Sequence, residues 1–146
     1  GIMGVWADRI NASIKGETPL PSVIERLGVG RIAEWRPGFV KKVWPLDAEL
    51  LNPAGVLFGG YLGVLADQVL SFATMTVLKD HESLRTGDLS IDFFRPIAEG
   101  PLEIEGHVIN RSRSQVHTEA RFLLPGGKLA ARGLATFAVL GGEPAS

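Results

Sequence analysis

Residues 59–79 read GGYLGVLADQVLSFATMTVLK, and this stretch is the strongest indication of how the chain folds. Within residues 61–79, apolar side chains recur at helical spacing and point in almost every direction around the axis, so the pattern predicts one long helix with hardly any polar face. A helix that is apolar on nearly all sides is buried rather than laid on a surface. The rest of the chain must therefore cover it on several sides.

The segments around this helix carry strand patterns. Residues 29–36 and 39–46 are rich in β-favouring side chains and are joined by a Pro-Gly pair at 37–38, which is a strong turn signal. After residue 84, alternating apolar positions recur from Leu89 onward in long strands linked by turns, which predicts an antiparallel meander. We therefore expect an α+β fold, in which an antiparallel sheet of about five to six strands is wrapped around one long central helix.

Length and composition are those of one globular domain. The chain has 146 residues, of which 45% are hydrophobic and 21% charged, so residues 1–146 are expected to form a single domain. Residues 1–27 would supply an N-terminal helix, over 3–15, and a lead-in. A net charge of −1 gives no electrostatic argument for nucleic acid, and no stretch fits a membrane span. The lack of cysteine fits a reducing, cytoplasmic compartment, and three scattered histidines predict no metal site.

Asp67 is the first candidate for chemistry. It is the only charged residue between Glu49 and Lys79, and it lies in the middle of the predicted buried helix. A lone buried carboxylate is costly unless it is paired or has a functional role. The residues alone leave two interpretations open: a catalytic carboxylate, or a structural one that caps a neighbouring loop or accepts backbone hydrogen bonds.

Gly59 and Gly60 stand at the start of the same helix. Free N–H groups at a helix start can hold an anion or a developing oxyanion, whereas close packing or a tight helix start is the structural alternative. Eight residues of helix span about 12 Å, so Gly59 and Asp67 of one chain cannot both reach one carbonyl. If both residues are catalytic, the site must combine Gly59 of one subunit with Asp67 of another, and function requires a dimer.

The stretch from Asn52 to Asp67, NPAGVLFGGYLGVLAD, resembles the signature of hotdog-fold acyl-CoA thioesterases of the phenylacetic-acid-degradation type, within the 4-hydroxybenzoyl-CoA thioesterase superfamily. That family typically shows an Asn, six residues to a His-Gly-Gly, and nine from that His to an Asp or Glu on the central helix. The spacings from Asn52 to Phe58 and from Phe58 to Asp67 are the same. LSIDFFRP at 89–96 and GLATF at 133–137 resemble later strands of the family, so the resemblance covers roughly residues 28–140.

The resemblance implies a hotdog fold and a thioesterase that hydrolyses an acyl-CoA to free acid and CoA, in a site formed between two subunits. It assigns Asp67 as the general base or nucleophile, and the Gly59 N–H of the opposite subunit as the donor that polarises the thioester carbonyl. Asn52 would help to position the carboxylate or the water from that opposite side. Thr86, ten residues before Pro96, would hold the attacking water.

The remaining predicted contacts surround the substrate. Phe58 and Gly60 are expected to contact the substrate. Phe58 stands where the family has its His, and either lines an acyl pocket or packs to shape the loop. Arg95, Arg111 and Arg113 would lie near the CoA phosphates, although arginines at strand ends are more often simply solvated. No metal or dissociable cofactor is implied, because coenzyme A is part of the substrate. The expected partners are the acyl-CoA and further copies of the chain, as a homodimer and a dimer of dimers, without nucleic acid or membrane.

Three other functions stay open at this point. A hotdog enoyl-CoA hydratase or dehydratase pairs an acid with a His, and no His lies near the start of the central helix. A non-catalytic acyl-CoA binder would bind its ligand without hydrolysis, and Phe58 in place of the His is its best support. A purely structural dimer domain would bind neither substrate nor effector. An acyl-carrier-protein thioester is the less favoured substrate of a thioesterase.

Overall fold

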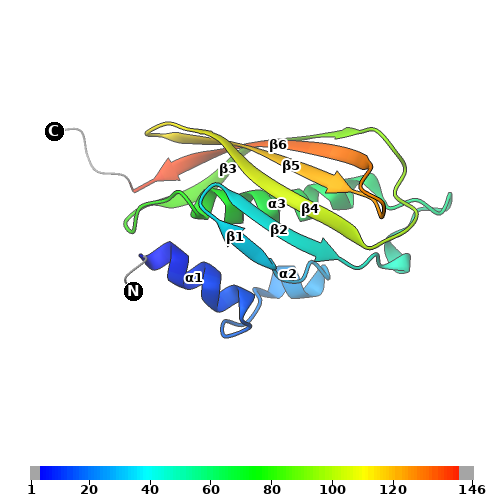
Figure 1. Cartoon of the computed structure of the whole chain (residues 1–146), viewed down its shortest axis with the longest axis horizontal. Helices are drawn as coiled ribbons and strands as arrows, with labels where there is room; N and C mark the ends of the chain where they lie inside the picture. Colours follow the sequence, from blue (N-terminus) through cyan, green and yellow to red (C-terminus); the bar gives the residue numbers. More distant parts are fainter. Residues whose placement is uncertain (1–3, 142–146) are drawn as a thin grey trace.

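The computed structural model describes residues 4–141, which form one antiparallel six-stranded sheet packed around one long helix (Figure 1). The long helix is α3 (Gly59–Met75), and two shorter helices, α1 (Val5–Ile14) and α2 (Ser22–Arg26), precede it together with the 3-10 turn η1 (Ala48–Leu50). The strands are β1 (Glu34–Arg36), β2 (Phe39–Trp44), β3 (Ser83–Phe93), β4 (Leu102–Arg111), β5 (Gln115–Leu123) and β6 (Leu129–Leu140). The predicted α+β architecture of a sheet wrapped around a central helix is confirmed.

The order of the strands differs from the predicted meander in one connection. The sheet runs β1-β2-β4-β5-β6-β3, so β4, β5 and β6 are successive neighbours, but β3 pairs with β6 rather than with β4. The prediction of a simple meander after residue 84 was therefore wrong for β3. Local turn signals specify hairpins, but they do not specify where a strand with a longer connection joins the sheet. The consequence is that β3 forms one edge of the sheet.

Three predicted boundaries also shift. The first predicted strand, 29–36, shortens to Glu34–Arg36, because the carbonyls of Val29 and Gly30 accept hydrogen bonds from buried side chains instead of from a neighbouring strand. The second strand ends before Pro45, which has no N–H to give to the ladder. The long helix begins two residues earlier than predicted and ends at Met75, so that 76–77 form a turn and 78–79 have no regular structure. Residue 3, at the start of the predicted N-terminal helix, lies outside the described residues.

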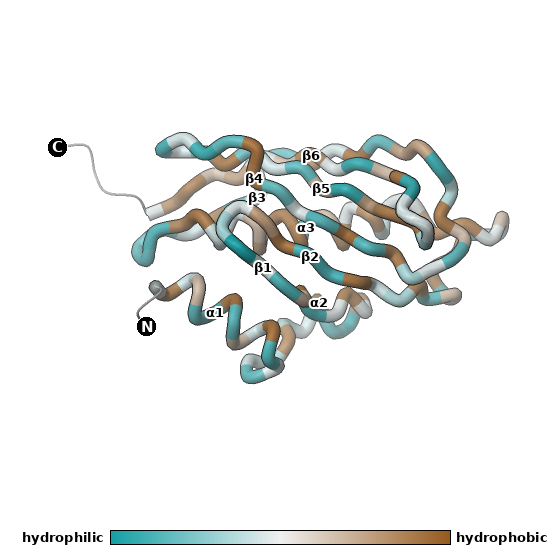
Figure 2. The backbone as a smooth tube through the Cα atoms, viewed as in Figure 1, coloured by the Kyte–Doolittle hydropathy of each residue, from teal (hydrophilic) through white to brown (hydrophobic). Residues whose placement is uncertain are grey.

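The core lies between α3 and the sheet. Leu65, Val69 and Leu70 on the helix have no exposed surface, and Figure 2 shows apolar positions running along α3 behind the strands. The helix approaches β4 closely at Gly106, where a Cβ atom would lie 2.6 Å from Cγ1 of Val69. The prediction that α3 is buried all around was too strong, since one stripe of the helix is only half-buried. That stripe consists of Gly63, Val64, Asp67, Ser71, Phe72 and Met75.

The N-terminal segment lies beside α3 and the β1 end of the sheet (Figure 1). The indole of Trp6 on α1 donates hydrogen bonds to the carbonyls of Lys79 and Glu82, in the connection that follows α3. The indole of Trp35 on β1 donates to Oδ1 of Asn11 at 2.8 Å. These contacts attach the N-terminal segment to the sheet and to the connection that follows α3.

The two edges of the sheet are unequal. β1 has three residues, whereas β3 has eleven, most of them exposed. A long exposed edge strand presents unpaired backbone groups that can pair with another chain. Three large side chains near the end of β3 and the start of α3 are also more than half exposed: Phe58, Phe93 and Phe94.

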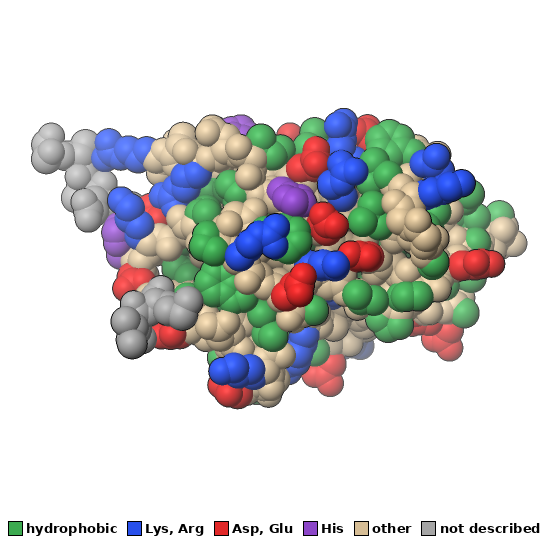
Figure 3. All heavy atoms as spheres, in the orientation of Figure 1, with side chains coloured by type: hydrophobic (Ala, Val, Ile, Leu, Met, Phe, Trp, Pro, Cys, Tyr) green, Lys and Arg blue, Asp and Glu red, His purple; other side chains and the backbone are tan. Residues whose placement is uncertain are grey.

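The outer face of the sheet is highly charged but mixed in sign. Figure 3 shows Lys and Arg side chains interspersed with Asp and Glu over this face, with His among them. An ion pair joins Lys41 on β2 to Glu103 on β4, and His107 contacts Glu105 at 3.1 Å. Among the described helices, none has the length and the apolar character that crossing a bilayer requires.

Candidate active site

Asp67 and Thr86 meet between the central helix and the edge strand. Asp67 lies in the middle of α3, and its Oδ1 accepts a 2.8 Å hydrogen bond from the Thr86 hydroxyl on β3. Asp67 is half-buried rather than fully buried, and no described residue donates to its other oxygen, Oδ2. The contact fixes the orientation of the carboxylate while leaving Oδ2 free to take a proton or to attack a carbonyl.

A β-bulge at Gly87 makes this contact compatible with the packing of β3. The register with β6 shifts between Thr86 and Asp88, so Gly87 is the extra residue. In a regular strand, alternate residues share a face, so Thr86 and Leu89, three positions apart, would point to opposite faces of the sheet. The extra residue in the bulge restores both side chains to the same face. Thr86 can therefore contact α3 while Leu89 and Ile91 still pack against the core.

The start of α3 is held by two backbone hydrogen bonds. The N–H of Leu57 donates to the carbonyl of Ile97 at 2.7 Å, and the N–H of Phe58 donates to the carbonyl of Leu50 at 3.0 Å. Helix α3 then begins at Gly59, with no side-chain cap, and no described residue accepts a hydrogen bond from the N–H of Gly59 or Gly60. The helix start is therefore anchored, and its first donors remain available to a ligand.

Both glycines also satisfy close packing. A Cβ atom on Gly60 would lie 2.9 Å from Cε1 of Phe58, and one on Gly59 would lie 3.3 Å from the Phe93 ring. The structural alternative considered from the sequence is thus present together with the free donors. Phe58 itself is 63% exposed, so its ring lies against Gly60 at the surface rather than filling the core.

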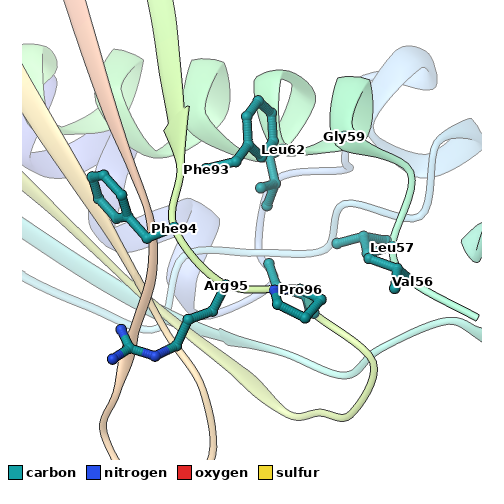
Figure 4. Close-up of a pocket in the computed structure, with 9 residues that line it drawn as sticks. Val56, Leu57, Gly59, Leu62, Phe93, Phe94, Arg95 and Pro96 are labelled. Atoms are coloured by element: carbon teal, nitrogen blue, oxygen red, sulfur yellow. The ribbon is translucent and has the colours of Figure 1, made fainter.

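Gly59 opens into a pocket of about 370 Å³ at the end of β3 (Figure 4). Phe93 and Leu62 lie side by side toward α3, whereas the Arg95 side chain extends away from them. The Arg95 guanidinium donates through Nη1 to the carbonyl of Leu129 at 2.8 Å and is exposed to solvent. Gly59 and Arg95 are therefore brought to the same pocket, which is otherwise mainly apolar.

Asp67 opens into a different pocket, of about 420 Å³, between α3 and residues 13–27. Gly59 does not line that pocket, and Asp67 does not line the pocket of Gly59. The two residues are eight positions apart on one helix, about 12 Å along its axis. The described residues of one chain therefore do not form a single site that contains both groups.

The Asn52 side chain is used mainly within its own loop. Its Oδ1 accepts hydrogen bonds from the N–H of Ala54 at 3.0 Å and of Val56 at 3.2 Å, and its backbone N–H donates to the Val56 carbonyl at 2.7 Å. This turn shapes the loop that leads to Phe58. Asn52 is exposed, and its side-chain NH₂ has no partner among the described residues.

Arg111 has structural partners. Its guanidinium donates to Oε2 of Glu82 at 2.7 Å and to the carbonyl of Val77 at 2.5 Å. Glu82 is 5% exposed, and the hydrogen bond from Arg111 is the main reason why the pKa of its carboxyl lies below the usual range. These bonds hold the connection between α3 and β3, so the Arg111 guanidinium already has partners within the protein.

The three arginines predicted to share the CoA phosphates do not come together in one chain. Arg95 follows β3 at the end where Phe93 pairs with Ala131, near the start of β6. Arg111 ends β4 at the opposite end of the sheet, where its neighbour Val116 pairs with the other end of β6. Arg113 lies in the exposed turn that follows Arg111. Among the described residues, no three His, Asp or Glu side chains gather as metal ligands would.

Sequence reasoning missed a buried lysine beside the site. Lys42 on β2 is 1% exposed, and its ammonium donates to Oε1 of Gln68 at 2.8 Å and to the Val29 carbonyl. Gln68, the neighbour of Asp67, in turn donates to the Gly30 carbonyl at 2.6 Å. Burial lowers the pKa of Lys42 to about 8. The available signal was its position, midway between the inward-facing Val40 and Trp44.

One known protein family matches more than half of the chain. The profile of the Thioesterase superfamily matches residues 54–131, which include Gly59, Asp67, Thr86 and Arg95. The matched segment contains α3 and the strands β3, β4 and β5. Residues 13–27 lie outside it.

Three similar proteins cover most of the chain. A protein of Saccharolobus solfataricus, named provisionally as an esterase, is 31% identical over 96 residues, which are 66% of this chain and 68% of its own. The structure of a phenylacetic acid degradation-related protein from Ralstonia eutropha, named provisionally as a thioesterase, superposes with a TM-score of 0.78 at 29% identity, covering 88% of this chain and 98% of its own. A Streptococcus mutans protein solved with acetyl-CoA shares the fold, with a TM-score of 0.69 at 20% identity, over 77% of this chain and 90% of its own.

Proposed function

Because the chain belongs to the thioesterase superfamily, we propose that it hydrolyses the thioester of an acyl-CoA to the free acid and CoA, in a site shared by two subunits. The observation that carries the proposal is the oriented Asp67 carboxylate, hydrogen-bonded to Thr86, on a helix whose free N-terminal donors open into a separate pocket. Each subunit then supplies one half of the site. A protein of the same fold, from Streptococcus mutans, was solved with acetyl-CoA, and this supports CoA as the thiol part of the substrate.

Edge-to-edge pairing of β3 provides the required arrangement. β3 is the long exposed edge of the sheet, and two-fold pairing of identical edge strands is antiparallel. The two α3 helices would then also run antiparallel. In the register that places Gly63 of both subunits at the two-fold axis, the start of one helix would lie beside the middle of the other, which is the position of Asp67. Gly59 of one subunit and Asp67 of its partner could thus face one carbonyl.

The chemistry then divides between the two subunits. The Gly59 N–H donates to the thioester oxygen and stabilises the negative charge that develops on it. In the general-base route, Oδ2 of Asp67 takes a proton from water as the water oxygen attacks the carbonyl carbon. The carbon–sulfur bond breaks, and the CoA thiolate leaves with that proton. In the alternative route, Oδ2 attacks the carbon directly, the carbon–sulfur bond breaks and CoA leaves as the thiolate. Water then hydrolyses the resulting anhydride, which restores the Asp67 carboxylate, releases the acid and supplies the proton that the thiolate takes up.

Thr86 has a positioning role in either route. The Thr86 hydroxyl donates its single proton to Oδ1 of Asp67, so the hydroxyl oxygen can only accept a hydrogen bond from a water. Such a water would lie beside the carboxylate. Arg95 lines the pocket of Gly59 and offers its remaining guanidinium donors to a CoA phosphate. In the antiparallel dimer, Arg113 of one subunit would lie at the same end as Arg95 of the partner subunit.

The test is thiol release from a panel of short, medium, long and aromatic acyl-CoAs. The wild type is expected to hydrolyse at least one class, and Asp67→Asn to lose about 10²-fold or more of that rate while keeping its melting temperature. Glu99→Gln, an exposed carboxylate in the loop after Pro96, is the matched control and should keep full activity. Absence of thiol release from every acyl-CoA in the wild type would overturn the proposal.

A second function is favoured by one observation, the aromatic ring at position 58. Phe58 is exposed and offers no proton or hydrogen bond to the substrate, so a site with this residue could bind acyl-CoA without turning it over. Calorimetric titration with the same acyl-CoAs distinguishes the two functions. Saturable binding without thiol release would make the protein an acyl-CoA-binding domain.

A further inference from the structure

We infer that Arg85 on β3 pairs with Asp92 on β3 of a second copy of this chain, and that these ion pairs fix the register in which the two copies assemble. The inference rests on the proposed function, because it takes β3 as the edge along which the subunits meet. It goes beyond that function by naming the residues that decide which register, and which partner strand, the edge accepts.

Four exposed polar side chains of β3 lie on the outer face of the sheet: Arg85, Asp88, Ser90 and Asp92. Asp92 lies opposite Arg132 on β6, whose Nη2 donates to its Oδ2 at 3.1 Å, and alternation places Ser90 and Asp88 on the same face. Arg85 precedes Thr86, which points inward to Asp67, so Arg85 points outward.

The charges of this row are not used up within the chain. No described residue pairs with the Arg85 guanidinium, and none donates to Oδ1 of Asp92. Asp88 and Ser90 have no side-chain partner among the described residues either. The outer rim of the edge therefore offers one cation and two anions, in a fixed order, to whatever strand pairs with it.

A two-fold axis reverses this order in the partner subunit. Directly opposite residues in an antiparallel ladder share a face, so outward residues meet outward residues. The bulge at Gly87 makes Arg85 the next outward position before Asp88. With the axis at Leu89, Asp88 therefore lies opposite Ser90 of the partner subunit, and Arg85 opposite Asp92 of the partner subunit. Both contacts occur twice in the dimer.

The two neighbouring registers place like charges together. With the axis at Asp88, that residue lies opposite its own copy. With the axis at Ser90, Asp88 lies opposite Asp92 of the partner subunit, again twice. Like charges directly opposite one another destabilise a ladder, whereas opposite charges stabilise it. The outer face therefore favours the register centred on Leu89.

The inner face requires the same register for an independent reason. Gly63 lies midway between Gly59 and Asp67 on α3. A Cβ atom on Gly63 would lie 3.9 Å from Cδ2 of Leu89, so the two residues are packed together. An axis at Leu89 thus also passes Gly63 and brings Gly59 beside Asp67 of the partner subunit. Moving the axis by one residue would slide the subunits by about 7 Å and separate these groups.

The experiment is a charge swap between subunits. Arg85→Glu and Asp92→Arg each place like charges opposite one another in their own homodimers, whereas a mixed dimer has opposite charges at both positions. The two variants are unfolded together, refolded and counted by native mass spectrometry. Random pairing gives half heterodimers, and we expect about nine-tenths or more. At dilute subunit concentration, the mixture should also release more thiol than either variant alone.

Arg121→Glu is the matched control. Its side chain is 43% exposed on β5, inside the sheet and away from both edges. Mixed with Asp92→Arg, it should give the random half of heterodimers. At about 1 M NaCl the excess of heterodimers in the first mixture should shrink, because exposed charges are screened.

Ser90→Arg tests the register without reversing a native charge. With the axis at Leu89, the new guanidinium faces Asp88 of the partner subunit, and the dissociation constant of the dimer should fall by about threefold or more. With the axis at Asp88 it would face Arg85 of the partner subunit, and with the axis at Ser90 its own copy, so the dimer would weaken. Sedimentation equilibrium measures the change.

Two results would overturn the inference. One is random pairing of Arg85→Glu with Asp92→Arg while both keep the wild-type melting temperature. The other is a weaker dimer in Ser90→Arg, which decides the matter on its own if Asp92→Arg does not fold.

The failure of the proposed function has a different signature. If the wild type releases no thiol from any acyl-CoA but the charge-swapped variants pair selectively, the hydrolytic function fails and the register stands. If hydrolysis occurs and depends on Asp67, but pairing is random, the function stands and the assignment of Arg85 and Asp92 fails.

Discussion

The Thr86 hydroxyl on the edge strand β3 donates a 2.8 Å hydrogen bond to Oδ1 of Asp67 on the central helix α3. This contact links the orientation of the proposed catalytic carboxylate to the strand along which a second subunit would pair. The Gly87 bulge is what allows Thr86 to reach the helix without turning Leu89 out of the core. Changes in the edge strand are therefore expected to affect activity as well as assembly.

Thr86→Val should lower kcat by roughly 10²-fold, because it keeps the shape of the side chain but frees the carboxylate to rotate. KM should stay near its wild-type value, since Thr86 does not hold the CoA moiety. Thr86→Ser, which retains the hydroxyl, should recover most of the rate. A Thr86→Ser variant as slow as Thr86→Val would show that the methyl group matters and the hydrogen bond does not.

Gly59→Pro removes the proposed oxyanion donor. Proline suits the first residue of a helix, and Phe58 before it has φ −55° and ψ 122°, an extended conformation that proline tolerates. The variant should lose about 10²- to 10³-fold in kcat. Gly59→Ala is its control, because it adds the same Cβ atom against the exposed Phe93 ring but keeps the N–H. Equal rates for the two variants would assign the loss to crowding.

Arg111 and Arg95 should give opposite results. Arg111→Met leaves the buried Glu82 carboxylate without its main partner, so the free energy of unfolding should fall by roughly 3 kcal/mol while KM is unchanged. Arg95→Ala should raise KM for acyl-CoA by about fivefold, the effect of one exposed charge pair, with stability nearly unchanged. Urea unfolding and steady-state kinetics measure both. A raised KM in stable Arg111→Met would return Arg111 to the CoA site.

The buried Lys42 predicts an unusual pH dependence of stability. Burial lowers its folded-state pKa from 10.5 to about 8, so between these values the unfolded chain binds a proton that the folded protein does not. The free energy of unfolding should therefore gain a rising contribution between pH 8 and 10.5, of roughly 3 kcal/mol in total. Below pH 8 this contribution is constant.

Lys42→Met is the comparison, because this variant lacks the Lys42 ammonium and keeps every other titratable group of the wild type. Urea unfolding at intervals from pH 7 to 10.5 should show a shallower rise in this variant than in the wild type. Parallel curves would mean that the Lys42 ammonium remains charged in the folded protein throughout the range.

Much of the fold could be predicted because its main determinants are local. The all-round apolar pattern of 61–79 predicts the central helix, and period-two alternation from Leu89 predicts a strand. The position of β3 beside β6 could not be predicted, since strand order depends on contacts between distant segments. Turn signals between neighbouring segments contain no information about it.

The site was predictable by position but not by contact. Spacing indicated Gly59 and Asp67, and their separation along one helix indicated two subunits. The Thr86–Asp67 hydrogen bond depends on the bulge at Gly87, which shifts the alternation of side chains along β3 by one residue. A bulge leaves no periodic pattern in the sequence that would predict it. The pocket wall from residues 13–27 was also missed. Its apolar side chains Leu20, Val23, Ile24 and Leu27 follow helical spacing, but the prolines at 19 and 21 indicate a break in structure, so the sequence predicted only a lead-in there.

The most direct test of a site shared by two subunits is complementation between inactive variants. Asp67→Asn and Gly59→Pro are unfolded together, refolded and assayed for thiol release. Random pairing gives half heterodimers, each with one intact site, so about a quarter of the wild-type rate should return. Asp67→Asn mixed with Thr86→Val is the control and should recover nothing beyond Thr86→Val itself, because both residues belong to the same half of the site. No recovery in the first mixture, with dimers formed, would show that Gly59 and Asp67 of different subunits do not share a site.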